Sequence, residues 1–220
     1  MGEILAMTVT FTRGLAALAV LATLTACGNT ASDGPSNLGI ARQALGQVLA
    51  GRRAAPAAPA PDPQAMAAEA LAVNKGPLIM VGLESMGTTQ VLAMTGQNGG
   101  MRTYMTKNEQ AVIMRGFMLT GTRGLGNDLS VAEAAGSAAL IGAGRSGAAQ
   151  RTMRIYSADG LERPLVFDCR IGPGPRAGVM VEDCAGHGLT FQNSYLPGAG
   201  VSRQWAGPGL GYVTVQTLRP

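Results

Sequence analysis

Charged and aromatic residues are both scarce in this sequence. Asp, Glu, Lys and Arg make up 14% of the chain, and Phe, Trp and Tyr only 4%. The net charge of +4 comes from basic residues scattered along the chain, which argues against the clustered basic patch of a nucleic-acid-binding protein. The chain also lacks a run of about 18 or more uncharged apolar residues, so it has no candidate membrane-spanning helix.

Histidine and cysteine are almost absent, with one His and three Cys. His187 and two isolated cysteines do not have the ligand spacing of a zinc site, so we expect no metal and no other cofactor. A Ser-His-Asp triad would have to use His187, but this residue lies in Ala-Gly-His-Gly, which is typical of a turn. The chain has no G-x-S-x-G elbow either. We therefore predict no catalytic residue.

Glycine and proline are abundant, at 32 and 12 residues, and this composition favours many short strands joined by turns. From Lys75 onward apolar residues recur at every second position, as in strands with one buried face. The pattern predicts about ten strands, within residues 77–84, 88–95, 100–106, 108–115, 116–121, 151–158, 161–170, 178–184, 189–196, 201–207 and 210–218. Short turns imply an antiparallel meander, so we expect a mainly all-β fold: a β-barrel-like domain with one to three short flanking helices.

Three segments have the pattern of short helices. Residues 38–50 carry apolar residues at helical spacing. Asp62-Pro63 is an N-cap followed by proline at the first helical position, which predicts a helix to about Val73. Asp128 can cap a third helix over residues 128–141. An Ala/Pro-rich linker separates the first two helices, and we expect it to be extended.

The N-terminal region has the features of a lipoprotein leader. Arg13 is followed by a short apolar run, Leu15–Leu24, and the lipobox Leu-Thr-Ala-Cys then ends at Cys27. We expect cleavage before Cys27 and lipidation of its thiol, because acyl chains on this residue anchor a protein to a membrane. Gly28 stands where an Asp would retain the protein in the inner membrane. The predicted location is therefore the outer membrane, with the domain facing the periplasm.

The chain is expected to have three parts: a signal peptide at 1–26, a segment at 27–74 with the lipidated Cys, tether, short helices and linker, and the barrel-like domain at 75–220. The cysteines of the last part agree with export. Cys169 and Cys184 lie on predicted neighbouring strands, and an even pair in an exported domain predicts a disulfide.

Two further patterns that mark binding or catalytic sites in other proteins, a glycine motif and pairs of carboxylates, do not indicate such a site in this sequence. Gly142–Gly147 matches G-x-G-x-x-G, but a dinucleotide site needs a strand before this motif and a helix after it, and the predicted order is the reverse. The carboxylates show no pairing pattern for glycoside hydrolysis. With a two-residue turn at Asp159-Gly160, Asp168 lies opposite Arg151, and we expect a cross-strand ion pair.

Two segments of the β-rich part carry a family resemblance. They are Thr-Arg-Gly-Leu-Gly-Asn-Asp-Leu at Thr122–Leu129 and Ser-Arg-Gln-Trp-Ala-Gly-Pro-Gly-Leu-Gly-Tyr-Val at Ser202–Val213. Together with the leader and the cysteine pair, these segments resemble the YjbF/GfcB family of lipoproteins over about residues 75–218. The resemblance implies a β-barrel-like fold and a part in exopolysaccharide or group 4 capsule production. It supplies no catalytic residue.

The resemblance favours a non-enzymatic accessory of polysaccharide assembly or secretion. Such a protein would contact exopolysaccharide or an outer-membrane export protein through Arg and aromatic side chains. The candidate surface residues are Arg123, Asp128, Arg203, Trp205 and Tyr212, although Trp205 also fits the end of a barrel core. The alternative is a periplasmic polysaccharide hydrolase or lyase, which requires two or more convergent carboxylates in a cleft, or His187 paired with a nucleophile. A structural envelope lipoprotein without glycan contact is the third hypothesis.

Overall fold

A single sheet of 12 strands dominates the computed structural model, which describes residues 62–156 and 162–220. Its strands are β1 (Leu78–Leu83), β2 (Thr88–Asn98), β3 (Met101–Met105), β4 (Ala111–Arg115), β5 (Met118–Arg123), β6 (Leu129–Glu133), β7 (Gly147–Tyr156), β8 (Glu162–Pro173), β9 (Met180–Gly186), β10 (Leu189–Leu196), β11 (Val201–Trp205) and β12 (Tyr212–Arg219). Strands β1 to β5 and β6 to β12 are two antiparallel meanders. The antiparallel pairing of β1 with β12 joins them.

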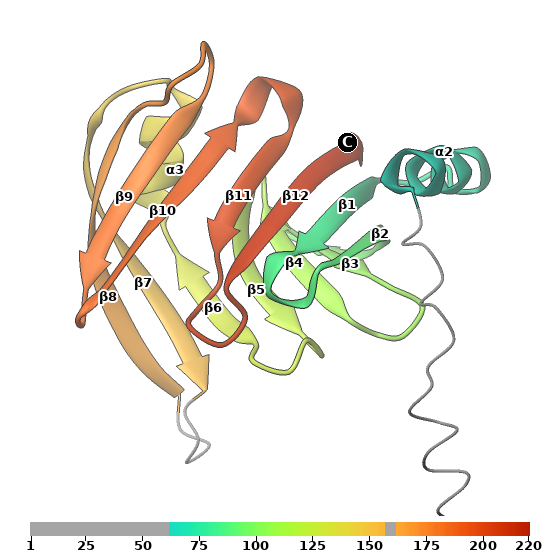
Figure 1. The fold of residues 1–220 in the computed structure, drawn as a ribbon, viewed down its shortest axis with the longest axis horizontal. Helices are drawn as coiled ribbons and strands as arrows, with labels where there is room; N and C mark the ends of the chain where they lie inside the picture. The colour runs from blue at the N-terminus through green and yellow to red at the C-terminus, as the bar shows by residue number, and fades with distance from the viewer. Residues whose placement is uncertain (1–61, 157–161) are drawn as a thin grey trace, which may run out of the picture. The chain divides into compact units, whose positions relative to one another are not determined.

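The sheet curls into a nearly closed barrel (Figure 1). Its two end strands, β5 and β6, lie next to one another but form no backbone ladder. The predicted all-β meander with a barrel-like shape is confirmed, with 12 strands where the pattern predicts about ten. None of the helices in the described ranges is long and apolar enough to cross a membrane.

Helix α2 (Pro63–Val73) begins where the sequence predicts, with the Asp62 side chain as its N-cap. Arg219, at the end of β12, donates hydrogen bonds to the Leu71 and Asn74 carbonyl oxygens. A positive charge at this end of a helix is favourable because the helix dipole is negative there. The last strand of the sheet therefore holds the C-terminal turn of α2.

Helix α3 (Ala135–Gly142) is shorter than the helix predicted over residues 128–141, which is wrong in its first half. The residues before Ala134 form strand β6, paired with β7. Asp128 does not cap a helix, because its carboxylate accepts hydrogen bonds from two N–H groups of the preceding loop. The Ala-rich sequence fits a helical period, but pairing with β7 decides its conformation.

Several predicted features lie outside the described residues. They are the signal peptide, Cys27, the helix at 38–50, most of the Ala/Pro linker and the Asp159-Gly160 turn. Strands β7 and β8 are paired as far as Tyr156 and Glu162, on either side of that turn. Strand β9 joins β8 only from Asp168 onward, so Pro164 lies where β8 has one neighbouring strand, an edge position that proline tolerates.

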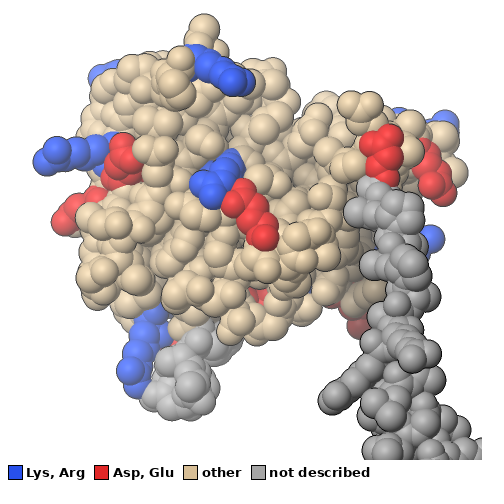
Figure 2. Space-filling view, viewed as in Figure 1, with Lys and Arg blue, Asp and Glu red and all other residues tan. Residues whose placement is uncertain are grey.

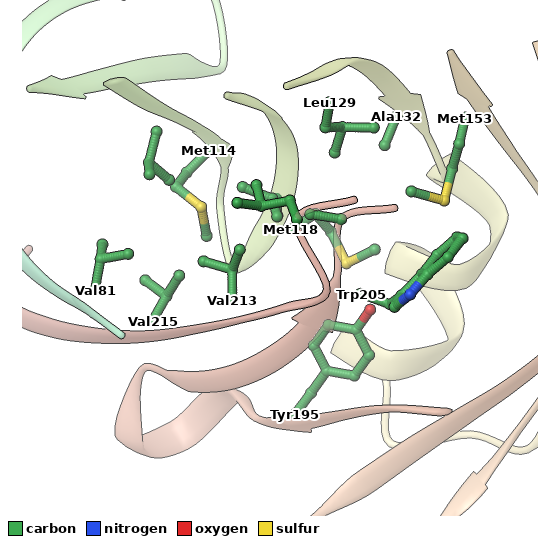
Figure 3. Packing of buried hydrophobic residues seen from close by; sticks show 14 of the residues in the cluster. Val81, Met114, Met118, Leu129, Ala132, Met153, Tyr195, Trp205, Val213 and Val215 are labelled. Carbon is green, nitrogen blue, oxygen red and sulfur yellow. The ribbon is translucent and has the colours of Figure 1, made fainter. Parts of the chain in front are cut away.

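Inward-facing side chains from nearly every strand pack into one core (Figure 3). Buried residues alternate with more exposed ones along the strands, as in other barrels. Val81, Val213 and Val215 lie opposite Met114 and Met118 in this core. Because burial of one such side chain stabilises a fold by about 1.5–3 kcal/mol, contacts between the two meanders hold the barrel together.

Candidate functional site

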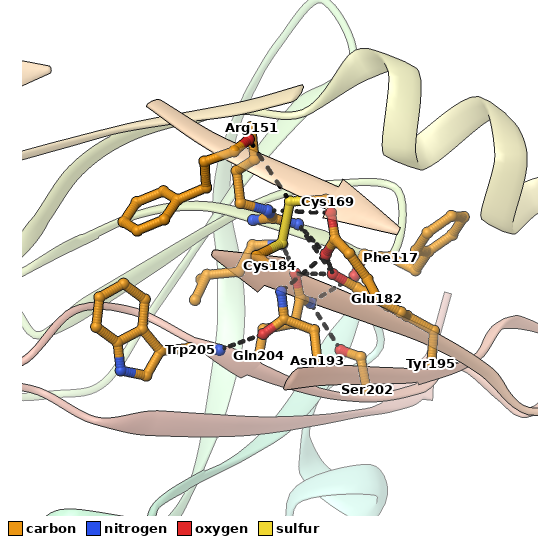
Figure 4. A network of polar contacts seen from close by, with 12 residues as sticks. Phe117, Arg151, Cys169, Glu182, Cys184, Asn193, Tyr195, Ser202, Gln204 and Trp205 are labelled. Carbon is orange, nitrogen blue, oxygen red and sulfur yellow. Dashed lines mark hydrogen bonds and ion pairs between the residues drawn. A yellow bond between two sulfur atoms is a disulfide. The ribbon is translucent and has the colours of Figure 1, made fainter. Parts of the chain in front are cut away.

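The barrel interior contains a buried polar network (Figure 4). The Arg151 Nη2 atom lies 2.8 Å from Glu182 Oε2 and 2.9 Å from the Tyr195 hydroxyl oxygen. Arg151 Nε lies 3.3 Å from the other carboxylate oxygen. The Arg151 and Glu182 side chains are only 1% and 0% exposed, so this ion pair joins β7 to β9 from inside the barrel.

The same network reaches the start of β5 through Gln204 of β11. The Gln204 side-chain amide donates to the Phe117 carbonyl oxygen at 2.8 Å and accepts from the Leu119 N–H at 2.9 Å. The Gln204 side chain therefore makes the hydrogen bonds to the Phe117 carbonyl and the Leu119 N–H that a neighbouring strand would otherwise make. The Tyr195 hydroxyl lies 3.4 Å from Gln204 Oε1 and connects this contact to the ion pair.

The ionisation states of the network follow from its contacts. Burial by itself raises the pKa of Glu182, but the Arg151 charge and the hydrogen bonds from Arg151 and Asn193 outweigh burial and lower it overall. Burial also raises the pKa of the Tyr195 hydroxyl, which stays protonated. Both carboxylate oxygens of Glu182 accept hydrogen bonds. This carboxylate is therefore engaged in the fold rather than available as a general acid or base.

The predicted disulfide is present beside this network. Cys169 on β8 and Cys184 on β9 are directly paired, with Cα atoms 4.1 Å apart, and both are buried. Their sulfur atoms lie within 4.8 Å of a Glu182 carboxylate oxygen. A metal ion would need the thiolates that the disulfide consumes, so the bridge links β8 to β9 and is not a metal site.

Trp205 belongs to the core, which corrects its place in the predicted surface. The residue is 8% exposed. Its ring stacks on Phe191 with the centroids 4.4 Å apart and meets Phe167 edge-on at 5.9 Å. Its backbone N–H donates to Asn193 Oδ1 at 2.7 Å. The indole therefore fills the barrel and is not available to a ligand outside it.

Arg123 and Asp128 bridge the gap between the two end strands of the sheet. The Arg123 guanidinium donates to the Leu129 and Ser130 carbonyl oxygens at 3.2 Å. Thr122 Oγ1 donates to Asp128 Oδ1 at 2.8 Å and accepts from the Leu129 N–H at 2.9 Å. Side chains thus replace the ladder that β5 and β6 lack, and these two predicted site residues make contacts that close the barrel.

The outer face of the barrel brings Arg203 and Tyr212 together. Arg203 Nε and Nη2 each lie 2.7 Å from a Glu84 carboxylate oxygen, and the guanidinium carbon lies 3.5 Å from the centre of the Tyr212 ring. The hydrogen bonds from Arg203 lower the pKa of Glu84. Figure 2 shows one face with few charged side chains, on which basic and acidic groups lie in contact. Arg203 and Tyr212, two of the predicted surface residues, are thus in contact on the outer face of the barrel.

A groove of about 900 Å³ crosses the outer faces of β7, β8, β9 and β10. Two alanines make it hollow, because Ala148 is paired with Arg170 and Ala185 with Asp168, so a short side chain stands opposite a longer one. The exposed polar residues that line it are Gln150, Asp168, Arg170, Asp183, Thr190 and Gln192. We refer to these eight residues as the outer groove.

The polar groups of the outer groove are partly engaged with one another. Its two glutamines donate to its two carboxylates, at 2.7 and 3.1 Å. The Arg170 guanidinium has no hydrogen-bond or ion-pair partner within residues 62–156 and 162–220. The Gln192 N–H donates to the Tyr212 hydroxyl at 3.2 Å, so the outer groove borders the Arg203–Tyr212 contact. Amide, carboxylate, hydroxyl and guanidinium groups in one open hollow suit a ligand rich in hydroxyl groups.

Asp168 does not form the ion pair predicted for it, and His187 does not lie in a catalytic triad. Asp168 lies opposite Gln150 and Arg151 points inward, so the predicted Asp168–Arg151 ion pair is wrong. The observed register of β7 and β8 differs by one residue from the one that a two-residue turn gives, and a shift of one residue exchanges the two faces of a strand.

His187 has a φ of 52° in the β9–β10 turn, and its Nε2 accepts from the Val166 N–H at 3.0 Å. This nitrogen therefore extends the backbone pairing of β8 and does not activate a nucleophile.

The sequence alone does not identify the outer groove. Gln150, Arg170 and Gln192 alternate with buried residues, and this alternation predicts only that each faces solvent. Their proximity depends on the register of four strands. The one local signal is the pair of exposed alanines, Ala148 and Ala185, among longer polar residues.

The fold is shared with a solved lipoprotein. The crystal structure of the hypothetical lipoprotein YmcC from Escherichia coli (K12) is similar with a TM-score of 0.58. The match covers 86% of this chain and 98% of that one at 14% sequence identity, which shows a common fold alone. No curated protein sequence matches the chain.

A family match places the chain more closely. Residues 42–218 match the family described as group 4 capsule polysaccharide lipoprotein gfcB, YjbF. The match begins at residue 42, well before residue 75, where the resemblance seen in the sequence begins. It includes the whole barrel except Arg219, the last residue of β12. The chain therefore belongs to the YjbF family of group 4 capsule polysaccharide lipoproteins.

Proposed function

We propose that this protein is a lipid-anchored, non-enzymatic accessory of capsule or exopolysaccharide assembly and secretion, and that its outer groove binds the polysaccharide. The family supports the polysaccharide context. The outer groove is the observation that carries the proposal, because it is an open hollow on the outside of the barrel with six polar side chains in its lining. A polymer can lie across such a site, whereas the interior is filled by the core and the buried network.

The outer groove has the chemistry of a saccharide site. Sugar hydroxyls both donate and accept hydrogen bonds, and the groove offers carboxylate acceptors together with amide, hydroxyl and guanidinium donors. The hydrogen bonds from the glutamines orient Asp168 and Asp183 before a ligand arrives, which reduces the ordering cost of binding. The Tyr212 ring beside the groove adds an aromatic surface of the kind that packs on sugars.

Lipidation of Cys27 is the second part of the proposal. It would hold the barrel at the outer membrane, on the periplasmic side. Cys27→Ala should move the protein from the membrane fraction to the soluble fraction, because the acyl chains supply the membrane affinity. The barrel should stay folded, since its core begins at Leu78. Labelled palmitate measures the modification, and a wild-type protein that takes up no label would remove the anchor from the proposal.

Polysaccharide binding tests the outer groove directly. The full chain is titrated with polysaccharide purified from the producing cells, and the Kd is measured by biolayer interferometry. Arg170→Ala and Gln192→Ala should each weaken binding about two- to tenfold, the effect of one hydrogen bond. Gln216→Ala removes an exposed glutamine on β12, outside the groove, and should leave the Kd unchanged. Equal affinities in all variants would overturn the assignment of the groove.

The second candidate function is a polysaccharide hydrolase or lyase. One observation favours it: Asp168 and Asp183 both line the outer groove, and paired carboxylates can perform general acid–base chemistry on a glycosidic bond. An enzyme would release new chain ends from the purified polysaccharide, and Asp183→Asn would abolish their release. Binding without any increase in chain ends supports the accessory function instead.

A further inference from the structure

A second hollow lies where the two ends of the sheet meet. A Cβ atom on Gly121 of β5 would lie 3.2 Å from the Ser130 carbonyl oxygen and 3.5 Å from that of Leu129 on β6. Glycine allows this close approach of two backbones. Next to this contact, residues of both end strands line a cavity of about 780 Å³. We refer to this cavity as the seam cleft.

The seam cleft has two apolar walls from different elements. The β2–β3 hairpin, β4 and β5 form one wall, and β6 with the start of α3 forms the other. Its apolar lining includes Met101, Ile113, Met118, Leu119, Ala132 and Ala135. No aromatic residue of the described ranges lines it, and methionine side chains adapt to a flexible apolar ligand. The lining therefore fits an aliphatic chain better than a sugar ring.

The rim of the seam cleft carries an unpaired cation. Arg115, at the end of β4, is exposed, and its guanidinium has no hydrogen-bond or ion-pair partner in the part of the chain that the structure describes. Arg123, in contrast, donates to carbonyl oxygens of β6, and Glu133 faces Arg154 at 3.9 Å. Arg115 is thus the rim group left to pair with a ligand, and the complementary ligand group is an anion.

We infer that the seam cleft binds one acyl chain of an anionic membrane lipid, with the lipid headgroup at Arg115. The cavity volume falls within the range of about 300–1,000 Å³ that is usual for ligand sites. A membrane lipid is the expected source of the chain because the family consists of lipoproteins. No residue lines both the seam cleft and the outer groove, so this site is separate from the one in the proposed function.

Photolabelling in vesicles tests the inference. The full chain is reconstituted into phosphatidylcholine vesicles that contain a phosphatidylglycerol probe with a diazirine on one acyl chain. Mass spectrometry then locates the labelled peptides, which should contain Met101, Met118 or Ala135. A phosphatidylcholine probe with the same diazirine chain should give about threefold fewer adducts there, the effect of one exposed ion pair.

Matched variants separate the cleft from other surfaces. Ala135→Trp fills the cleft from α3 and should abolish the cleft adducts, whereas Ala139→Trp, exposed on the same helix but outside the cleft, should not. Arg115→Gln should make the two probes label the cleft equally. Arg170→Ala, in the outer groove, should leave the labelling unchanged.

Several results would overturn the inference. One is labelling spread over the barrel, and another is cleft labelling that survives Ala135→Trp. A third is an absence of cleft adducts together with a dimer that Ala135→Trp dissociates, because a second copy of the chain would then be the occupant. A wild-type protein that takes the photolabel in the seam cleft but binds no polysaccharide in the titration contradicts the proposed function alone. A wild-type protein that binds polysaccharide but takes no photolabel in the seam cleft contradicts the lipid site alone.

Discussion

Arg151 and Glu182 form an ion pair at the centre of the barrel, 2.8 Å apart and almost completely buried. Tyr195 and Gln204 extend this contact from β7 and β9 to β10, β11 and the start of β5. Both meanders of the sheet therefore meet in one polar network. Because buried charges are costly without their partners, the network favours the strand register that satisfies all of its groups.

Removing one member of the pair should strongly destabilise the protein. Glu182→Gln leaves the Arg151 charge buried without its counter-charge, at a cost of about 3–5 kcal/mol in the free energy of unfolding. Urea denaturation followed by circular dichroism measures this cost. As a control, Glu133→Gln removes an exposed partner of Arg154 and should cost less than about 1 kcal/mol. Equal costs for the two substitutions would contradict a stabilising role of the buried pair.

The same pair predicts how stability depends on pH. The pKa of Glu182 is lower in the folded protein than its ordinary value of 4.5, so the unfolded chain binds this proton more readily. The contribution of the pair is therefore present above about pH 4.5 and is lost as the pH falls through the folded-state pKa. Glu182→Gln lacks this titration, so its free energy of unfolding should fall less than that of the wild type between about pH 6 and pH 3. Denaturation at a series of pH values tests this, and parallel curves would count against it.

The disulfide should contribute measurably to stability. Cys169 and Cys184 are separated by 15 residues, and closing a loop of this size stabilises a fold by about 3 kcal/mol in the chain-entropy model. Replacing both by alanine should lower the free energy of unfolding by a similar amount. A reductant should destabilise the wild type but not the double variant. Two titratable thiols in the untreated barrel would refute the bridge.

The close approach of β5 and β6 can be tested at Gly121. A Cβ atom there would lie 3.2 Å from the Ser130 carbonyl oxygen, so Gly121→Ala should displace β6 and cost about 1–3 kcal/mol. Hydrogen exchange of the Leu129 N–H, which donates to Thr122 Oγ1, should become faster. Gly96→Ala has open space around its Cβ and is the control. Unchanged exchange in Gly121→Ala would show that the strands do not meet at this position.

Local sequence patterns predict most of this fold. Period-two alternation identifies the strands because each buries one face, and Asp62 before Pro63 identifies the start of α2. Strand β6 is the main exception, because its small residues fit a helix and only the partner strand β7 distinguishes the two. The register of β7 and β8 is the second exception. A two-residue turn at Asp159-Gly160 places Asp168 opposite Arg151, whereas the structure pairs Asp168 with Gln150 and points Arg151 into the barrel.

The candidate site is less predictable because its residues are distant in sequence. Arg203 and Glu84 are 119 residues apart, and the outer groove combines four strands. The family resemblance does not separate surface from core either. Within one resembling segment, Arg203 lies on the outer face while the adjacent Gln204 is buried, because successive strand residues face opposite sides. Trp205, at the end of β11, is buried as well.

The amount and chain length of surface polysaccharide test the proposed function most directly. Cells that lack the gene are complemented with the wild-type chain, with Cys27→Ala or with the Arg170→Ala/Gln192→Ala double variant, at equal protein levels. The account predicts that deletion lowers the amount or length of the polymer, that the wild type restores it, and that neither variant restores it fully. Polymer of unchanged amount and length in the deletion strain would contradict the account.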